Sequence, residues 1–184
     1  STSAVASPVV MQRKKNGEFR MCIDYRKLNE STKSMCLPMP NGKDVLYRMQ
    51  GSAYFARIDL KKGFHQIAMT RESIPYTAFA TPDGLYEYTT MPFGLKNPSG
   101  FFQASMEQVL AGIPNCEVFV DDVVIHGTTQ AEYLTALDAV LNALDIRGFR
   151  LNRDKCQFGL KTVEYIGHVI SADGICMSES RKEA

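Results

Sequence analysis

The sequence predicts an α+β protein built around an antiparallel sheet. Two hairpins are indicated, one turning at Asn16-Gly17 and one at Pro82-Asp83-Gly84, because these residues favour tight turns between extended segments. Helical segments are interspersed with the strands, but no regular repeat of strand, helix and strand is evident. This order favours an antiparallel sheet over a doubly wound parallel one.

Extended segments are predicted where short apolar runs end at turn residues. Segments 8–12 and 20–25 flank the first turn, and the later "LPMPNG" is interrupted by proline and glycine as a loop is. Segment 53–60 alternates between two faces and carries Asp59 near its end. Segment 163–171 indicates a strand pair or one bent strand.

Two segments have the spacing of helices. In "GFFQASMEQVLAG", residues 100–112, Phe102, Met106 and Val109 are spaced for one face, and Pro114 follows the end. The clearer helix covers residues 130–147, where Thr128 or Thr129 can cap the start and Gly148 ends it. Four leucines recur there at the spacing of one face: Leu134, Leu137, Leu141 and Leu144.

Composition places the chain among ordinary soluble globular proteins, with 45% hydrophobic and 22% charged residues. No apolar run reaches the roughly 18 residues of a membrane span, and we expect no signal peptide. The five cysteines include no Cys-x-x-Cys pair, which argues against a disulfide framework or a zinc site. We expect all five to be buried, reduced thiols in a reducing compartment.

Charge is distributed unevenly along the chain although the net charge is only +1. Residues 1–33 hold seven Lys/Arg against three Asp/Glu, and the remainder is acidic. This asymmetry suits a site where cations and carboxylates share a polyanion. The chain does not begin with Met and ends in the charged "SESRKEA", so we expect a piece of a longer protein.

Two adjacent carboxylates, Asp121 and Asp122, separate the apolar runs 118–120 and 123–125. If these runs are paired strands, the carboxylates occupy the turn. A turn readily explains one Asp. Two adjacent like charges repel, however, and a divalent cation would remove that repulsion.

Asp59 strengthens the metal interpretation because it ends a different strand. Three carboxylates from two strand ends are enough to hold two Mg²⁺ ions when the phosphates of a substrate supply other ligands. Such a pair of ions stabilises the attacking and leaving oxygens of a phosphoryl transfer. The sequence therefore predicts a two-metal site at Asp59, Asp121 and Asp122.

Six blocks in order resemble reverse transcriptases, most of all the polymerase of gypsy-type LTR retrotransposons. They are "SPVVMQRKKNGEFRMCIDYRKLN", "YFARIDLKKGFHQI", "YTAFATPDGLYEYTTMPFGLKN", "FQASM", "FVDDVVIHG" and "LNRDKCQFGLKTVEYIGHVIS". The resemblance implies a fingers-and-palm core whose antiparallel palm sheet is backed by helices, with the thumb absent. The implied parts are fingers over 1–33 and 67–107, palm over 34–66 and 108–171, and the start of a truncated thumb over 172–184.

The resemblance also implies roles for individual residues. Asp59 and Asp121 would bind both metal ions, with Mn²⁺ as a substitute for Mg²⁺, and Asp122 would support them. Phe64 matches the aromatic under the incoming sugar, where a ring excludes a 2′-hydroxyl, although plain core packing is the simpler account of an isolated Phe. The other implied contacts are Lys14, Arg20, Lys62, Gly63 and Gln103 to the nucleotide, and Gly167 and His168 to the primer and template.

Several positions depart from the family pattern. Phe119 replaces a usual Tyr, so a hydroxyl is lost while packing should survive. His126 stands where Tyr is common, and "NPSGFFQ" at residues 97–103 replaces a usual "NAPATFQ", which could alter the helix start beneath Gln103. None of these changes removes a carboxylate.

The leading hypothesis is an RNA- and DNA-directed DNA polymerase that adds deoxynucleotides to a primer. A non-catalytic nucleic-acid-binding module and an RNA-dependent RNA polymerase are the alternatives, and Phe64 argues against the second. Expected partners are an RNA or DNA template with its primer, deoxynucleoside triphosphates, and the thumb and RNase H regions of a parent polyprotein, with no membrane. We expect a cytoplasmic location within virus-like particles.

Overall fold

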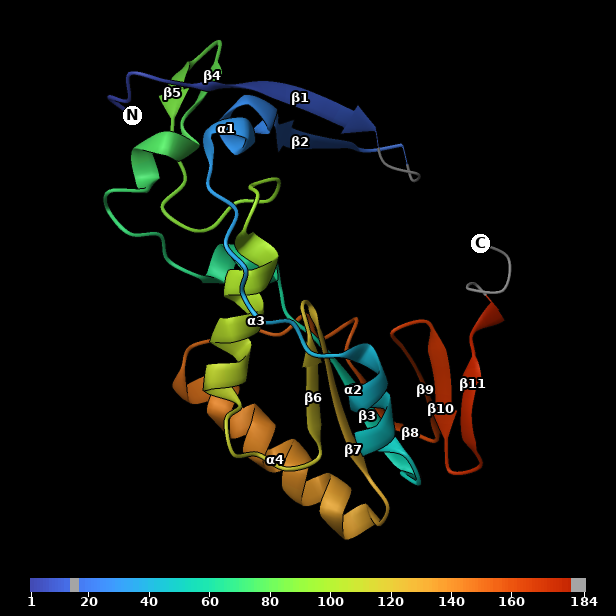
Figure 1. Ribbon diagram of the computed structural model, residues 1–184. Helices are drawn as coiled ribbons and strands as arrows, with labels where there is room; N and C mark the ends of the chain where they lie inside the picture. The colour runs from blue at the N-terminus through green and yellow to red at the C-terminus, as the bar shows by residue number, and fades with distance from the viewer. Residues whose placement is uncertain (14–16, 180–184) are drawn as a thin grey trace. The chain divides into compact units, whose positions relative to one another are not determined.

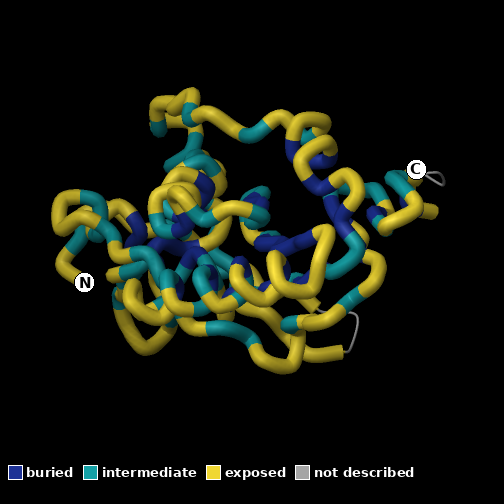
Figure 2. Tube along the Cα trace, turned by 90° about the horizontal axis from the view of Figure 1, so that it is seen from below, coloured by how far each residue is buried: buried dark blue, intermediate teal, exposed yellow. Residues whose placement is uncertain are grey.

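The computed structural model describes residues 1–13 and 17–179, which form two compact units. Unit 1 comprises residues 1–36 and 62–101, and unit 2 comprises residues 37–61 and the chain from 102 onward. Helices and strands are mixed, as an α+β protein requires. Buried residues, dark blue in Figure 2, occur in short runs between longer exposed stretches.

Unit 1 contains a four-stranded sheet in the order β2-β1-β4-β5 (Figure 1). β1 (Ser7–Arg13) pairs with β2 (Phe19–Ile23) as an antiparallel hairpin, and β4 (Phe79–Thr81) turns at Pro82-Asp83 into β5 (Gly84–Tyr86). Both strand pairs were predicted, and Asn16 of the first turn lies outside the described residues. The pairing of β1 with β4 is parallel and was not predicted, since no local pattern encodes it.

Short helices complete unit 1. They are α1 (Arg26–Ser31) and the 3₁₀ helices η1 (Gly63–Gln66) and η2 (Ile74–Thr77). Tyr25, which is buried, donates a hydrogen bond from its hydroxyl to the carbonyl of Thr77 at 2.8 Å. This bond ties the start of α1 to the end of η2 within the unit.

Unit 2 is built on an antiparallel sheet in the order β6-β7-β3-β8. Its strands are β3 (Tyr54–Asp59), β6 (Cys116–Phe119), β7 (Asp122–Gly127) and β8 (Gln157–Leu160). A three-stranded antiparallel sheet follows, made of β9 (Thr162–Tyr165), β10 (His168–Ser171) and β11 (Gly174–Met177). Segment 163–171 is thus a strand pair, one of the two predicted possibilities.

Helices cover both faces of the four-stranded sheet. α4 (Gln130–Ile146) packs on the face that carries Tyr54, whose ring stacks on Tyr133 of the helix. α2 (Gly42–Met49) packs on the other face through a core cluster: Val45, Leu46, Met49, Phe55, Val124, Val163, Tyr165 and Ile170. Truncating Phe55 in this core would cost about 3–5 kcal/mol of stability.

Helix α4 begins where it was predicted, with Thr129 and Glu132 forming a capping box. The face marked by the four leucines is buried only in part, because Leu144 is buried and Leu134 is not. The buried residues are Tyr133, Ala136, Val140 and Leu144, whereas Leu134 is 49% exposed. Tyr133 and Ala136 were not counted in the leucine pattern, yet the close approach of α4 to Gly127 on β7 places Tyr133 against the sheet.

Helix α3 (Pro98–Val109) corresponds to the predicted helix over residues 100–112, and it buries Phe102 and Met106 fully. All five cysteines are free, but the prediction that they are buried was wrong: three are half-buried (Cys22, Cys116 and Cys156) and two are exposed (Cys36 and Cys176). Within the described ranges, no helix combines the length and apolar character that crossing a membrane requires.

Candidate functional site

Three carboxylates meet at one end of the unit 2 sheet. Asp59, the last residue of β3, is the direct antiparallel partner of Asp122, the first residue of β7. Asp121 immediately precedes Asp122, in the turn between β6 and β7. Since Phe55 pairs with His126 on the same face under α2, this pair of Asp continues that face beyond its apolar cover. The sequence prediction that two strand ends bring these carboxylates together agrees with the register.

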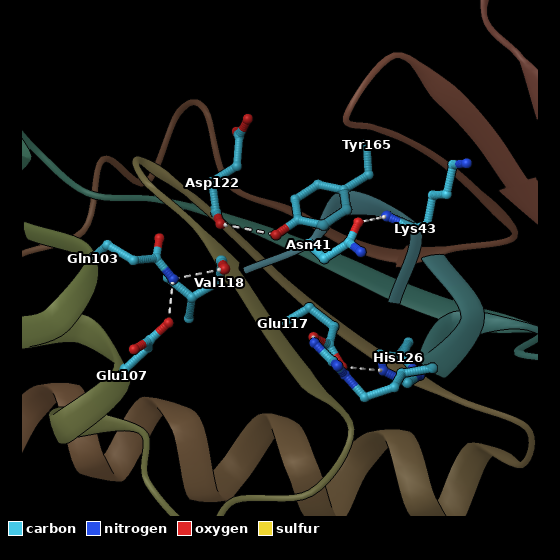
Figure 3. A network of polar contacts seen from close by, with 10 residues as sticks. Asn41, Lys43, Gln103, Glu107, Glu117, Val118, Asp122, His126 and Tyr165 are labelled. Atoms are coloured by element: carbon cyan, nitrogen blue, oxygen red, sulfur yellow. Dashed lines mark hydrogen bonds and ion pairs between the residues drawn. The ribbon is translucent and has the colours of Figure 1, made fainter. Parts of the chain in front are cut away.

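The β6–β7 turn has a strained backbone. Val120 adopts a φ of 53°, in the left-handed region that a β-branched residue rarely enters. The side chain of Gln103 on α3 holds this turn: its Oε1 accepts from the amide of Val120 at 2.6 Å, and its Nε2 donates to the carbonyl of Val118 at 3.0 Å. Figure 3 shows Gln103 reaching the strand from the helix, with Glu107 as a further acceptor at 2.7 Å.

Gln103 was predicted to contact the nucleotide near its ribose. In the structure its side chain is fully buried, and both ends of the amide are engaged with the turn and with Glu107. A direct nucleotide contact stays a prediction. What the geometry adds is support for the segment that carries Asp121.

Arg57 forms an ion pair with one of the three carboxylates, that of Asp122. Lying two residues before Asp59 on the same face of β3, it donates through Nη2 to Oδ1 of Asp122 at 2.5 Å. Tyr165 donates to the backbone carbonyl of Asp122 at 3.3 Å (Figure 3). Both the carboxylate and the backbone carbonyl of Asp122 therefore have partners within the protein.

Asp121 has a raised pKa beside the two other carboxylates. Desolvation at the turn raises the pKa of its carboxyl, although the residue is exposed, and the negative charges of Asp122 and Asp59 raise it further. The charges of all three groups thus interact. A divalent cation beside them would reverse the sign of this effect and favour the ionised form.

The donor set suits a hard cation but does not enclose one. Carboxylate oxygens are the ligands that Mg²⁺ prefers, and Mg²⁺ is usually held by one or two carboxylates together with substrate phosphates. Among the described residues, no group of three or more His, Cys, Asp or Glu side chains is arranged to hold a metal by itself. The fit is therefore to a cation shared between two carboxylates and a substrate.

A group of aromatic and basic residues lies within unit 1. The guanidinium of Arg20 lies 5.0 Å from the ring centre of Phe93, and Phe93 meets Phe64 edge to face at 5.0 Å. Burial lowers the pKa of His65, and the positive charges of Lys62 and Arg20 lower it further. The predicted residues Arg20, Lys62 and Phe64 are therefore close to one another.

Other predicted nucleotide contacts are placed as follows. Lys62 has a φ of 52° and caps η1, which starts at Gly63, and the amide of His65 donates to the Lys62 carbonyl at 2.8 Å. Phe64 is buried, which is compatible both with core packing and with a position under a sugar. Lys14 lies outside the described residues.

The predicted primer contacts are Gly167, in the turn between β9 and β10, and His168, the first residue of β10. Ile166 and Gly167 have φ of 48° and 69°, and His168 Nδ1 lies 2.9 Å from the Ile166 carbonyl. Tyr165, which precedes this turn, contacts the backbone of Asp122. The hairpin is thus joined to the carboxylate end of the sheet.

A separate pocket of about 340 Å³ lies at the outer edge of β6. Its polar lining is largely satisfied internally, because Arg48 donates to both oxygens of Glu117 at 2.8 and 2.6 Å. None of the three Asp lines this pocket, so we do not take it as the site. Its lining residues are Pro40, Arg48, Glu107, Leu110, Ile113, Pro114, Asn115, Cys116, Glu117 and Val118.

Comparison with known protein families shows which family the chain belongs to. A family model described as "Reverse transcriptase (RNA-dependent DNA polymerase)" matches residues 12–170. The chain belongs to the reverse transcriptase family. Members of this family generally use divalent metal ions, which agrees with the carboxylate chemistry of the site.

Relatives of this reverse transcriptase chain are Pol polyproteins of transposons. It is 43% identical over 160 residues to the retrovirus-related Pol polyprotein from transposon 297 of Drosophila melanogaster, covering 86% of this chain and 15% of that polyprotein. It is 36% identical over 161 residues to the polyprotein from transposon gypsy of the same species, covering 86% and 16%. The chain thus spans about a sixth of these relatives.

Solved structures with the same fold include foamy viral protease–reverse transcriptases. The protein in complex with double-stranded DNA superposes with a TM-score of 0.89 and 27% identity, over 100% of this chain and 32% of that one. A complex with an RNA/DNA hybrid gives 0.88 and 26%, over 100% and 25%. The predicted reverse-transcriptase fold is confirmed.

The residues of this reverse transcriptase that depart from the family pattern all make contacts within the fold. Phe119 packs against the core cluster on the α2 side, as expected for a ring without its hydroxyl. His126 is buried, with Nδ1 at 2.9 Å from Ser52 Oγ and Nε2 at 3.9 Å from Glu117. α3 begins at Pro98, and Gln103 still reaches the turn.

Sequence reasoning missed Arg57 and Cys156 around the carboxylates of this reverse transcriptase, and it named Gln103 for a different role. No role was predicted for Arg57, although a basic residue two positions from Asp59 on one strand face was a usable signal. The support of the turn by Gln103 and the contact of Cys156 with Asp59 depend on long-range packing. No local pattern could reveal either.

Proposed function

We propose that this chain is the fingers and palm of a DNA polymerase that extends a primer on an RNA or DNA template. The single observation that carries the proposal is the register of β3 against β7, which pairs Asp59 with Asp122 beside Asp121. The family match and the foamy viral complexes with nucleic acid support it. Unit 1 corresponds to the fingers and unit 2 to the palm.

Asp59 and Asp121 are the proposed ligands of two Mg²⁺ ions, which Mn²⁺ could replace. Asp122 has a supporting role, because Arg57 already holds its carboxylate. When bound, the ions would stabilise the attacking primer 3′-oxygen and the leaving pyrophosphate oxygen. The protein contributes position and charge: the turn, held by Gln103, fixes Asp121, and β3 fixes Asp59.

Unit 1 would bind the incoming deoxynucleoside triphosphate. Arg20 and Lys62 would supply positive charge for phosphates, with Lys14 as a third cation, and the backbone amides at Lys62 and Gly63 would face the same triphosphate. Phe64, braced edge-on by Phe93, would leave no room for a 2′-hydroxyl. In unit 2, Gly167 and His168 would hold the primer end, and the thumb and RNase H regions of the parent polyprotein would extend the grip on the duplex.

Primer extension tests the proposal. A labelled primer annealed to an RNA or a DNA template is incubated with the chain and deoxynucleotides, with Mg²⁺ or with chelator. We expect extension only with the metal, and a loss of at least about 100-fold in Asp121→Asn, as for removal of a group that stabilises a transition state. Asp145→Asn, on the exposed side of α4, is the matched control.

Two outcomes would overturn the proposal. Extension by Asp121→Asn at the wild-type rate would show that the carboxylate has no part in the chemistry. Binding of primer–template that persists in chelator, without extension in Mg²⁺ by any variant, would instead support a non-catalytic nucleic-acid-binding module.

A further inference from the structure

The backbone of Asp59 lacks a strand partner on one side. β7 pairs with β3 along its full length on the other side, whereas β8 begins at Gln157, which pairs with Arg57. Asp59 therefore lies beyond Gln157, the first residue of β8, and has no partner in that strand. A buried or half-buried backbone amide and carbonyl still need partners, so other groups must supply them at this position.

The thiol of Cys156 is one of those groups. The amide of Asp59 donates to Cys156 Sγ at 3.4 Å, and the same thiol lies 3.6 Å from the Asp59 carbonyl, to which it can donate. The amide of Asn152 donates to that carbonyl at 2.8 Å. One side chain thus takes the place that a strand residue would fill beside Asp59.

Cys156 is itself fixed by a compact turn just before β8. Its amide donates to the carbonyl of Asn152 at 3.1 Å, and an isolated bridge joins Leu60 to Leu151. The amide of Lys61 donates to the Arg150 carbonyl at 2.9 Å. The segment 150–156 therefore continues the sheet edge next to the last residue of β3.

We propose that Cys156 is a positioning residue that fixes the Asp59 carboxylate for divalent cation binding. The inference rests on the proposed function, since it assumes that Asp59 is a metal ligand. The thiol acts through the Asp59 backbone and touches no substrate. Groups hydrogen-bonded to a metal-ligating side chain typically contribute about 10- to 100-fold to metal affinity, and we place Cys156 at the lower end because it contacts the backbone of Asp59 and not its carboxylate.

The test is a Mn²⁺ titration of the 184-residue chain, followed by electron paramagnetic resonance of the free ion. Cys156→Val keeps an apolar side chain of similar size but removes both hydrogen bonds, and Cys156→Ser keeps a donor and an acceptor. We expect Cys156→Val to weaken Mn²⁺ binding about 10-fold. Cys156→Ser should recover most of that loss.

Cys116→Val is the matched control, because it changes a half-buried free thiol in β6, at the opposite edge of the same sheet. It should bind Mn²⁺ as the wild type does. Thermal unfolding of each variant shows whether it is folded. Should Cys156→Val fail to fold, the comparison of Cys156→Ala with Cys156→Ser replaces it and is judged by the same difference.

Wild-type Mn²⁺ affinity in a folded Cys156→Val chain, with Asp59→Asn impaired, would overturn the positioning role alone. Wild-type affinity in Asp59→Asn would overturn the metal role of Asp59, and the positioning role with it. Equal weakening in Cys156→Val and Cys116→Val would show that loss of any half-buried thiol has the same effect, which also overturns the proposal.

Discussion

Asp59 on β3 lies directly opposite Asp122 on β7, while Arg57 on the same strand forms an ion pair with Asp122 at 2.5 Å. One end of a sheet thus holds two acids in register and a cation that balances one of them. This leaves Asp59 and Asp121 as the carboxylates available to a bound cation.

Replacing Arg57 with Gln should strengthen cation binding. The change removes a positive charge near the site and frees the Asp122 carboxylate, and the repulsion between a unit charge and a divalent ion about 6 Å away through water is worth about 1.4 kcal/mol, or roughly 10-fold. Mn²⁺ titration measures the effect. Arg153→Gln, an exposed residue of the segment before β8, provides the comparison, and weaker binding by Arg57→Gln would contradict this account of the ion pair.

Replacing Gln103 with Leu should destabilise the chain by about 2–4 kcal/mol. Leu has nearly the same volume but leaves the Val120 amide and the Val118 carbonyl without the partners they now have. Urea unfolding followed by circular dichroism measures the change. Gln108→Leu, exposed on the same helix, should shift the free energy of unfolding by less than about 0.5 kcal/mol.

Glu117 predicts a pH dependence of stability. Burial alone would raise the pKa of Glu117, but the nearby His126 ring and the hydrogen bonds from Arg48 lower it on balance below its ordinary 4.5. A lowered folded-state pKa stabilises the fold above the unfolded pKa, and this stability is lost as pH falls through the folded pKa. The free energy of unfolding should therefore decrease below about pH 4.5.

Glu117→Gln is the variant that isolates this effect. It should be less stable than the wild type at pH 7, and the gap should narrow as the pH falls below 4.5, because the wild type loses the ionised carboxylate there. Urea unfolding at pH 7, 5 and 4 measures both. A gap that stays constant over this range would show that Glu117 contributes through packing and not through charge.

Replacing Phe64 with Ala should admit ribonucleotides. Removing the ring opens the space that the 2′-hydroxyl would need, so the ratio of ribo- to deoxynucleotide incorporation should rise about 10-fold or more. Single-nucleotide extension assays measure this ratio. Tyr76→Ala, an exposed aromatic of unit 1, should leave it unchanged. An unchanged ratio in Phe64→Ala would leave core packing as the role of this ring.

Much of the fold could be predicted because its signals are local. Alternation in β3, the turn at Pro82-Asp83 and the cap at Thr129 each depend on neighbouring residues. The parallel contact of β1 with β4 joins segments about 70 residues apart in the chain, and no local pattern encodes it.

In the site, too, the features with local sequence signals were predicted and the long-range contacts were not. The pairing of Asp121 and Asp122 beside Asp59 followed from strand ends, whereas the contacts of Cys156 and Gln103 are made by side chains to a distant backbone. The buried face of α4 was predicted only in part: Leu144 is buried, but Leu134 is exposed, because the close approach of the helix at Gly127 places Tyr133 against the sheet.

A crystal structure of the chain soaked in Mn²⁺ tests the central claim most directly, because anomalous scattering locates the ion. We predict a peak within coordination distance of carboxylate oxygens from both Asp59 and Asp121, and its loss in Asp59→Asn. A Mn²⁺ peak bound elsewhere, with none between these two carboxylates, would contradict the account.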